Sequence, residues 1–136
     1  MKEFRNPLDV HPPLAGYTHQ VEITGPERLL IISGQVGRTV EGQVPADPVQ
    51  QLEIACANLI RNLRAAQMDA PDIVKINLYL VGRMDAEKRR QVLVSWLGGH
   101  KPCMTLVYVA GLAAPQYKVE LEAWAAKPEQ LQEPPV

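Results

Sequence analysis

The chain of 136 residues has the usual length of one compact domain, and 46% of its residues are hydrophobic, enough for a buried core. Its formal net charge is −1 and its basic residues form no stripe, so a nucleic-acid partner is not expected. No apolar run is long enough to span a membrane and no signal-peptide pattern is present, which predicts a cytoplasmic protein without a membrane partner. Two cysteines, Cys56 and Cys103, form neither a CxxC motif nor a disulfide framework.

The first part of the chain predicts an irregular arm followed by a β-hairpin. Residues 1–16 contain three prolines and show no periodicity. Residues 17–24 alternate between two faces, and residues 28–33 form a short apolar run. The segment Gly25-Pro26-Glu27 between them is typical of a turn, so we expect the two strands to pair with each other.

The middle of the chain predicts two amphipathic helices on either side of a strand. Asp47-Pro48 is a capping carboxylate followed by proline at the first helical position, and apolar residues then repeat at spacings of three and four to about Gln67. Cys56 lies on this apolar stripe and is expected to be a packed structural thiol. Residues 72–81 alternate as a half-covered strand. Asp85 can cap a second helix, which two glycines end.

Two further strands are predicted at residues 103–110 and 117–125. In the second of these, Glu120 and Glu122 alternate with aliphatic residues, so their two carboxylates share one face. The polar, proline-rich residues 127–136 predict a flexible tail.

These elements predict a single α/β (α+β) domain at residues 1–126 with both helices on one face of a sheet. The other face keeps apolar residues, because neighbouring pairs such as Ile31-Ile32 and Val107-Tyr108 place them on both sides of a strand. We therefore expect a partner subunit to bury that face in a homo-oligomer.

Motifs for specific chemistry are few. The sequence contains no P-loop, no GxGxxG and no GxSxG, and its three histidines are scattered, so neither a cofactor nor a metal site is expected. Read from the residues alone, Glu120 is either a solvated strand carboxylate or a site residue. Ser33, at a strand end beside Gly34, is either a ligand donor or an ordinary turn residue.

Five short patterns, in order along nearly the whole chain, resemble the RidA (YjgF) family of enamine/imine deaminases. They are Ala15-Gly16-Tyr17, Ser33-Gly34-Gln35, Gln51 with Asn58-Leu59, Asp72-Ile73-Val74-Lys75, and Val119-Glu120-Leu121-Glu122-Ala123-Trp124-Ala125. The resemblance implies a chorismate-mutase-like fold with a six-stranded mixed sheet. It also implies a homotrimer around a central barrel, with small-molecule sites in the clefts between subunits and no cofactor.

The resemblance also implies roles for individual residues. Family members hydrolyse reactive imines or enamines to a 2-oxo acid and ammonia, and an arginine holds the substrate carboxylate. Glu120 matches the catalytic glutamate that places or polarises water. Tyr17 and Ser33 match residues that line the cleft.

The chain departs from the family at the arginine. Where the family has Pro-Ala-Arg-Ser-Cys, this chain has Pro102-Cys103-Met104-Thr105-Leu106, and the second helix begins Ala86-Glu87-Lys88-Arg89-Arg90 without the usual asparagine. A thioether cannot bind a carboxylate, so the sequence predicts a subgroup lacking the arginine, with an apolar cleft. Met104 and Thr105 join Tyr17 and Ser33 as the expected substrate-binding residues.

Several alternatives stay open at this point. Arg38, His19 or Lys101 of a neighbouring subunit could replace the lost anchor. The protein is either a hydrolytic deaminase or a non-catalytic trimer that binds a small metabolite. A third reading, endoribonuclease, is disfavoured because the sequence has no basic surface.

Overall fold

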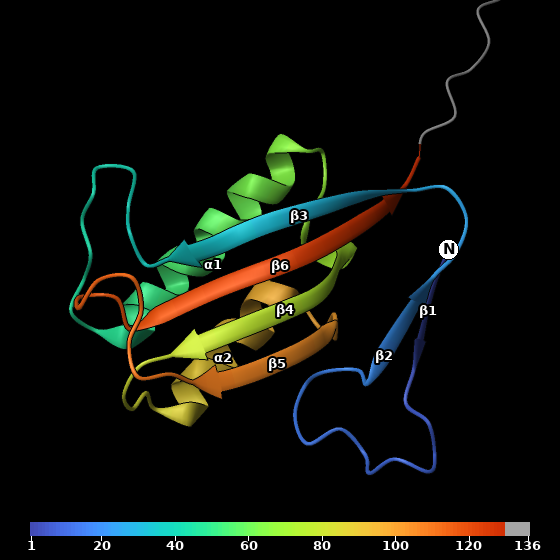
Figure 1. Ribbon diagram of the computed structural model, residues 1–136, viewed down its shortest axis with the longest axis horizontal. Helices are drawn as coiled ribbons and strands as arrows, with labels where there is room; N and C mark the ends of the chain where they lie inside the picture. Colours follow the sequence, from blue (N-terminus) through green and yellow to red (C-terminus); the bar gives the residue numbers. More distant parts are fainter. Residues whose placement is uncertain (130–136) are drawn as a thin grey trace, which may run out of the picture.

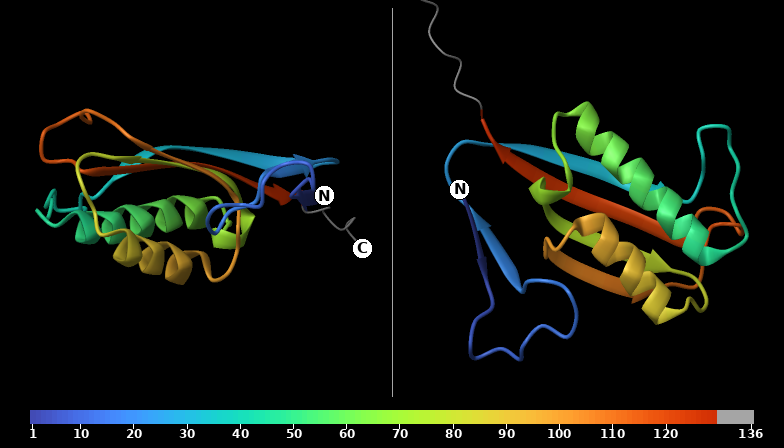
Figure 2. Two further views of the ribbon diagram at one scale, coloured as in Figure 1. Left: turned by 90° about the horizontal axis from the view of Figure 1, so that it is seen from below. Right: turned by 180° about the vertical axis from the view of Figure 1, so that it is seen from behind.

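The structure is a computed structural model that describes residues 1–129, and it has two layers: a four-stranded sheet and two helices packed on one of its faces (Figures 1 and 2). A separate two-stranded sheet lies to one side (Figure 1). The elements are β1 (Lys2–Arg5), β2 (Gln20–Ile23), β3 (Glu27–Val36), α1 (Pro48–Ala65), the 3-10 helix η1 (Ala70–Asp72), β4 (Ile73–Leu80), α2 (Ala86–Leu97), β5 (Cys103–Tyr108) and β6 (Val119–Pro128).

The larger sheet is mixed, in the order β3-β6-β4-β5. Strand β6 runs antiparallel to both of its neighbours, β3 and β4. Strands β4 and β5 are parallel, and α2 is the crossover between them. The predicted α+β class, with two helices over one face of a mixed sheet, is confirmed, and β3 and β5 are the sheet edges.

Both helices begin where their capping residues predict. The Asp47 carboxylate accepts a hydrogen bond from the backbone N–H of Val49 at 3.1 Å, and the Asp85 carboxylate accepts one from the N–H of Lys88 at 3.0 Å. Helix α2 ends at Gly98, whose φ of 60° is the left-handed conformation that glycine adopts without strain.

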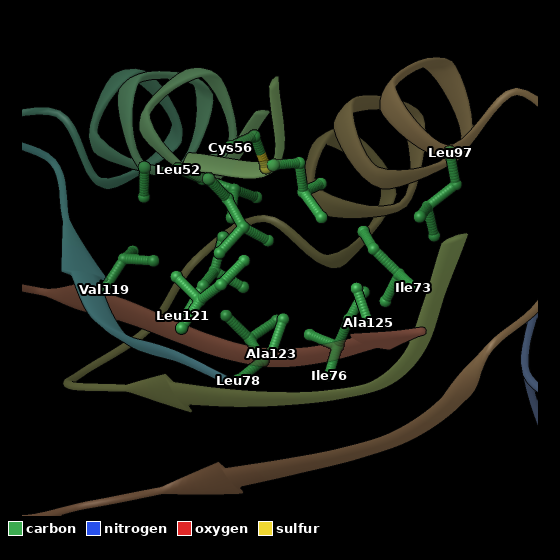
Figure 3. Packing of buried hydrophobic residues seen from close by; sticks show 14 of the residues in the cluster. Leu52, Cys56, Ile73, Ile76, Leu78, Leu97, Val119, Leu121, Ala123 and Ala125 are labelled. Carbon is green, nitrogen blue, oxygen red and sulfur yellow. The ribbon is translucent and has the colours of Figure 1, made fainter. Parts of the chain in front are cut away.

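The core lies between the helices and the sheet. Figure 3 shows Leu52 and Cys56 of α1 facing Leu121 and Ala123 of β6, all of them buried. Cys56 is buried in this core, which confirms its predicted packed role, and the burial raises the pKa of its thiol. Because alternate residues of β6 point into this core, Glu120 lies on the opposite face of the sheet.

The N-terminal part differs from the prediction. Strand β1 pairs antiparallel with β2, with Glu3 opposite Glu22, so residues 1–16 are not wholly irregular and residues 17–24 do not pair with 28–33. The guanidinium of Arg5 donates hydrogen bonds to both of these carboxylates and compensates their repulsion. The prediction of a local hairpin was wrong, because the pairing of β1 with β2 depends on contacts between segments distant in sequence, which local alternation does not show.

The six strands therefore form one four-stranded and one two-stranded sheet within the chain, and the expected six-stranded sheet is not formed by one chain.

The predicted tail at residues 127–136 also needs correction at its start. Lys127 and Pro128 belong to β6, and the Lys127 ammonium donates to the carbonyl of Gln67 at 2.9 Å. The rest of that tail, residues 130–136, lies outside the described residues. Within residues 1–129, neither helix has the length and apolarity to cross a membrane.

Candidate functional site

The sheet face opposite the helices, here called the open face, carries both polar and apolar side chains. Two aliphatic side chains of β3 are strongly exposed on this face: Leu29 is 61% exposed and Ile31 is 65% exposed. The residues of the open face are Leu29, Ile31 and Ser33 of β3, Glu120, Glu122 and Trp124 of β6, Lys75, Asn77 and Tyr79 of β4, and Cys103, Thr105 and Val107 of β5.

Glu120 lies directly over the backbone of Gly34. A Cβ atom at position 34 would be 1.9 Å from Oε1 of Glu120 and 2.7 Å from its carboxyl carbon, so only glycine leaves room for this side chain. The register between β3 and β6 shifts at this point, between Ile32 and Gln35. Within residues 1–129 the Glu120 carboxylate has no hydrogen-bond partner, so packing positions it and its oxygens remain available to a ligand or water.

Two side chains of α1 fix the backbone around Glu120. The buried amide of Gln51 donates to the carbonyls of Pro45 and Gln116 and accepts from the N–H of Lys118, at 2.8 to 2.9 Å. The amide of Asn58 donates to the carbonyl of Val36, the residue that pairs with Glu120. Both residues belong to the patterns that carry the family resemblance, and their role in the structure is to hold the strands that present Glu120.

Glu122, two residues further along β6, is bound differently. Its Oε1 accepts hydrogen bonds from the Tyr79 hydroxyl at 2.5 Å and from the Asn77 amide at 3.0 Å. These bonds lower the pKa of Glu122, chiefly through Tyr79, and the bond to Glu122 raises the pKa of Tyr79. The Glu122 carboxylate thus has hydrogen-bond partners in its own chain, whereas the Glu120 carboxylate has none within residues 1–129.

A cleft of about 480 Å³ lies at the other edge of the sheet, between α2 and β5, and we call it the Met104 cleft. Met104 pairs with Ile76, a core residue, so its side chain points toward the helices and away from the open face. Leu106 follows on the same side. Tyr17 also lines the cleft, and its hydroxyl accepts a hydrogen bond from the N–H of Leu14 at 3.2 Å.

The segment that carries Tyr17 is attached to the strand that carries Met104. The Thr18 hydroxyl donates to the carbonyl of Lys101 at 2.6 Å, and the Thr18 N–H donates to the carbonyl of Pro102 at 3.3 Å. The rings of Phe4 and His100 add an edge-to-face contact with centroids 5.7 Å apart. The paired strands β1 and β2 therefore dock on the segment that precedes β5, and this sets one wall of the cleft.

The structure thus separates the predicted site residues into two groups. Tyr17 and Met104 meet in the Met104 cleft. Ser33 and Glu120 lie on the open face beside Gly34. Thr105 belongs to neither group, since it lies on the open face of the edge strand and accepts a hydrogen bond from the Lys75 ammonium at 2.7 Å. One chain does not bring these residues together.

Three features of the site escape a reading of the sequence. Gly34 looks like an ordinary turn residue until its contact with Glu120 is seen. The bond between Tyr79 and Glu122 joins strands 43 residues apart. Arg89 lines the Met104 cleft from α2. Among residues 1–129, no cluster of histidine, cysteine and acidic side chains is arranged to hold a metal.

Comparison with known proteins agrees with the fold. The model of the family described as Endoribonuclease L-PSP matches residues 9–127. A RutC family protein of Pyrococcus horikoshii is 28% identical over 133 residues, which cover 93% of this chain and 99% of the relative. The crystal structure of YyfB, a Rid-family protein of unknown function from Yersinia pestis, superposes with a TM-score of 0.80 at 28% identity and covers 93% of this chain and 98% of that one. RidA from an Antarctic Psychrobacter species superposes with a TM-score of 0.67 at 26% identity, covering 84% and 90%. The chain therefore belongs to the Endoribonuclease L-PSP family, which is the RidA (YjgF) family that its sequence resembles.

Proposed function

We propose that this protein is a RidA-family hydrolase of small imine or enamine metabolites, of a subgroup that lacks the carboxylate-binding arginine, and that it works as a homotrimer. The observation that carries the proposal is the Glu120 carboxylate, which is held over Gly34 and has no hydrogen-bond partner within residues 1–129. A carboxylate in this state can accept a proton from water, which a carboxylate already bound by its neighbours does less well.

The division of the site residues supports an assembly. Tyr17 and Met104 lie on the helix side of the edge strand β5, while Ser33 and Glu120 lie on the open face near the opposite edge. A site that uses both groups needs the cleft of one chain and the open face of another. The exposed Ile31 beside Ser33 supports the same arrangement, because a partner subunit would bury it.

The proposed chemistry needs only water and a carboxylate. Glu120 takes a proton from a water molecule whose oxygen attacks the imine carbon, giving a tetrahedral carbinolamine. Glu120 returns that proton to the nitrogen of the carbinolamine and then moves the hydroxyl proton to the same nitrogen, so that the carbon–nitrogen bond breaks and ammonia leaves as the carbonyl forms. In the overall reaction, the imine and one water molecule give the 2-oxo product and ammonia. No redox step is involved.

RNA cleavage is not part of the proposal, although the family name includes an endoribonuclease. Phosphate backbones are bound by clustered lysine and arginine side chains. The formal net charge here is −1, and the free carboxylate of Glu120 would repel a phosphate.

The test compares Glu120→Gln with Glu122→Gln, the same change two residues away on the same face. Ammonia and 2-oxo product are measured from an imine generated enzymatically in the assay, above the spontaneous rate. Loss of a general base lowers the rate on the order of 10²- to 10⁴-fold, so Glu120→Gln should be nearly inactive while Glu122→Gln keeps most of the activity. If the wild type binds the substrate without accelerating hydrolysis, the protein is a non-catalytic binder and the proposal is wrong.

A further inference from the structure

Arg89 is a positive charge of the Met104 cleft that has no carboxylate partner within residues 1–129. It is half-buried, it lines the cleft, and its guanidinium makes one hydrogen bond to a neutral group, from Nη1 to the Tyr108 hydroxyl at 3.3 Å. No ion pair within residues 1–129 includes it. The guanidinium therefore keeps donors and a full charge available to a ligand.

Its neighbours in the cleft are already engaged or more exposed. Arg90 pairs with Glu87, with nitrogen–oxygen distances of 2.6 and 3.0 Å, so the two charges cancel. His100 is bound through Nε2 to the carbonyl of Ile73 at 2.7 Å. Lys101 is exposed at the rim. Arg89 is thus the half-buried cation of the cleft whose guanidinium is not already paired with a carboxylate among residues 1–129.

The rest of the wall is apolar and lies on both sides of Arg89. Leu93 and Leu97 follow it at spacings of four along α2, and Met104 and Leu106 face them from β5. A guanidinium set in such a wall suits an anion that carries a hydrocarbon chain. A planar carboxylate can bind the guanidinium fork, and the chain can cover Met104.

We infer that Arg89 anchors the carboxylate of the ligand, in place of the arginine that the chain lacks at position 104, and that the cleft selects small carboxylates with an apolar tail of several carbons. The inference rests on the proposed function only for the location of the ligand site. It modifies the expectation, drawn from Met104, of an apolar cleft that cannot bind a carboxylate.

The test measures binding to the full-length protein by calorimetry, with hexanoate as the probe and hexanamide as its uncharged counterpart. The wild type should bind hexanoate about tenfold more tightly or better, the ratio expected from one charge-assisted hydrogen bond. Arg89→Gln should bind the two compounds equally, and Arg89→Lys should keep part of the preference. Lys88→Gln, which removes a charge from the same helix outside this cleft, should retain the full preference.

A second measurement uses the wild type alone and does not depend on the folding of a variant. Phenylglyoxal modifies arginine side chains, and its reaction at Arg89, located by peptide mass analysis, should be slowed by hexanoate and not by hexanamide. Absence of this protection, equal wild-type affinity for the two compounds, or loss of the preference in Lys101→Gln but not in Arg89→Gln would each overturn the inference. Because these readouts need no turnover, a failure of hydrolysis leaves them valid. If Arg89→Gln leaves the rate of hydrolysis unchanged, this inference is wrong, but the proposed hydrolase function is not contradicted.

Discussion

The carboxylate of Glu120 occupies the space that a side chain at Gly34 would need, with only 1.9 Å between Oε1 and the position of a Cβ atom. The φ angle of Gly34 is not left-handed, so backbone conformation does not require glycine there. The requirement is steric and comes from a residue 86 positions later in the chain. A substitution at position 34 therefore tests directly where the Glu120 carboxylate lies.

Gly34→Ala should leave the protein folded and lower its hydrolytic rate. The added methyl group displaces the half-buried and flexible Glu120 side chain, and a displacement of about 1 Å in a catalytic group costs on the order of 10²-fold in rate. Stability should change by about 1 kcal/mol or less, since no core atom is displaced. Ammonia release and thermal unfolding check the two parts.

The control for this experiment is Gly111→Ala, because a Cβ atom there meets nothing within 4 Å. It should match the wild type in both rate and stability. Full activity in Gly34→Ala would mean that the position of Glu120 in the structure is not the one used in catalysis.

The protein should sediment as a trimer at micromolar concentration. The exposed Ile31 and Leu29 supply apolar area for an interface, and a stable contact needs roughly 1,000 Å². Ile31→Glu should dissociate the assembly, because it would bury a charge without a partner. Val40→Glu is the control, since Val40 is 97% exposed in a loop and should tolerate the change. A monomeric wild type would contradict the prediction.

Met104→Arg should improve turnover of the shortest imino acids. A substrate such as 2-aminoacrylate has no tail to fill the apolar cleft and hold its carboxylate at Arg89. A carboxylate left without a charge-assisted partner costs about 2–5 kcal/mol, or about thirty- to several-thousand-fold in rate. We expect the wild type to turn it over poorly and Met104→Arg to recover at least about tenfold.

Recovery should be incomplete, because Leu106 also differs from the family pattern and the surroundings of Met104 are not arranged to hold a guanidinium. Adding Glu120→Gln should abolish the gained activity. Wild-type turnover of 2-aminoacrylate equal to that of relatives with the arginine would show that position 104 does not matter for short substrates.

The bond between Tyr79 and Glu122 should make a pH-dependent contribution to stability. The pKa of Glu122 is lowered from 4.5, so the stabilisation is present at neutral pH and is lost as the pH falls through this lowered value. The pKa of Tyr79 is raised from 10.0, so the tyrosine remains protonated throughout the neutral range, and its contribution is lost only as the pH rises through the raised value.

Tyr79→Phe should therefore cost about 1 kcal/mol near pH 7, a modest value because both groups are only half-buried. Chemical denaturation at a fixed protein concentration measures this difference. The difference between wild type and Tyr79→Phe should shrink as the pH falls below 4.5 and through the lowered pKa of Glu122. A difference that is constant from pH 3 to pH 7 would mean that the hydrogen bond to the carboxylate is not its source.

The sequence by itself determined the elements whose signals are local. Asp47-Pro48 and Asp85 mark the helix starts because a capping carboxylate acts within its own first turn. The alternation in β6 places Glu120 and Glu122 on the face away from the core, because side chains alternate across any strand. These signals, together with the ordered family patterns, also indicated the α+β class and the residues from which a site would be built.

Only the tertiary structure decided which of these residues meet. The pairing of β1 with β2, the contact of Gly34 with Glu120 and the hydrogen bond from Tyr79 to Glu122 all join segments distant in sequence, and no local pattern records them. The pairing register then places Met104 opposite Ile76 on the core side and Glu120 opposite Tyr79 on the open face, although both lie in strands predicted from the sequence. The physical reason is that hydrophobic periodicity specifies which side of an element is buried, whereas long-range packing specifies what that element is buried against.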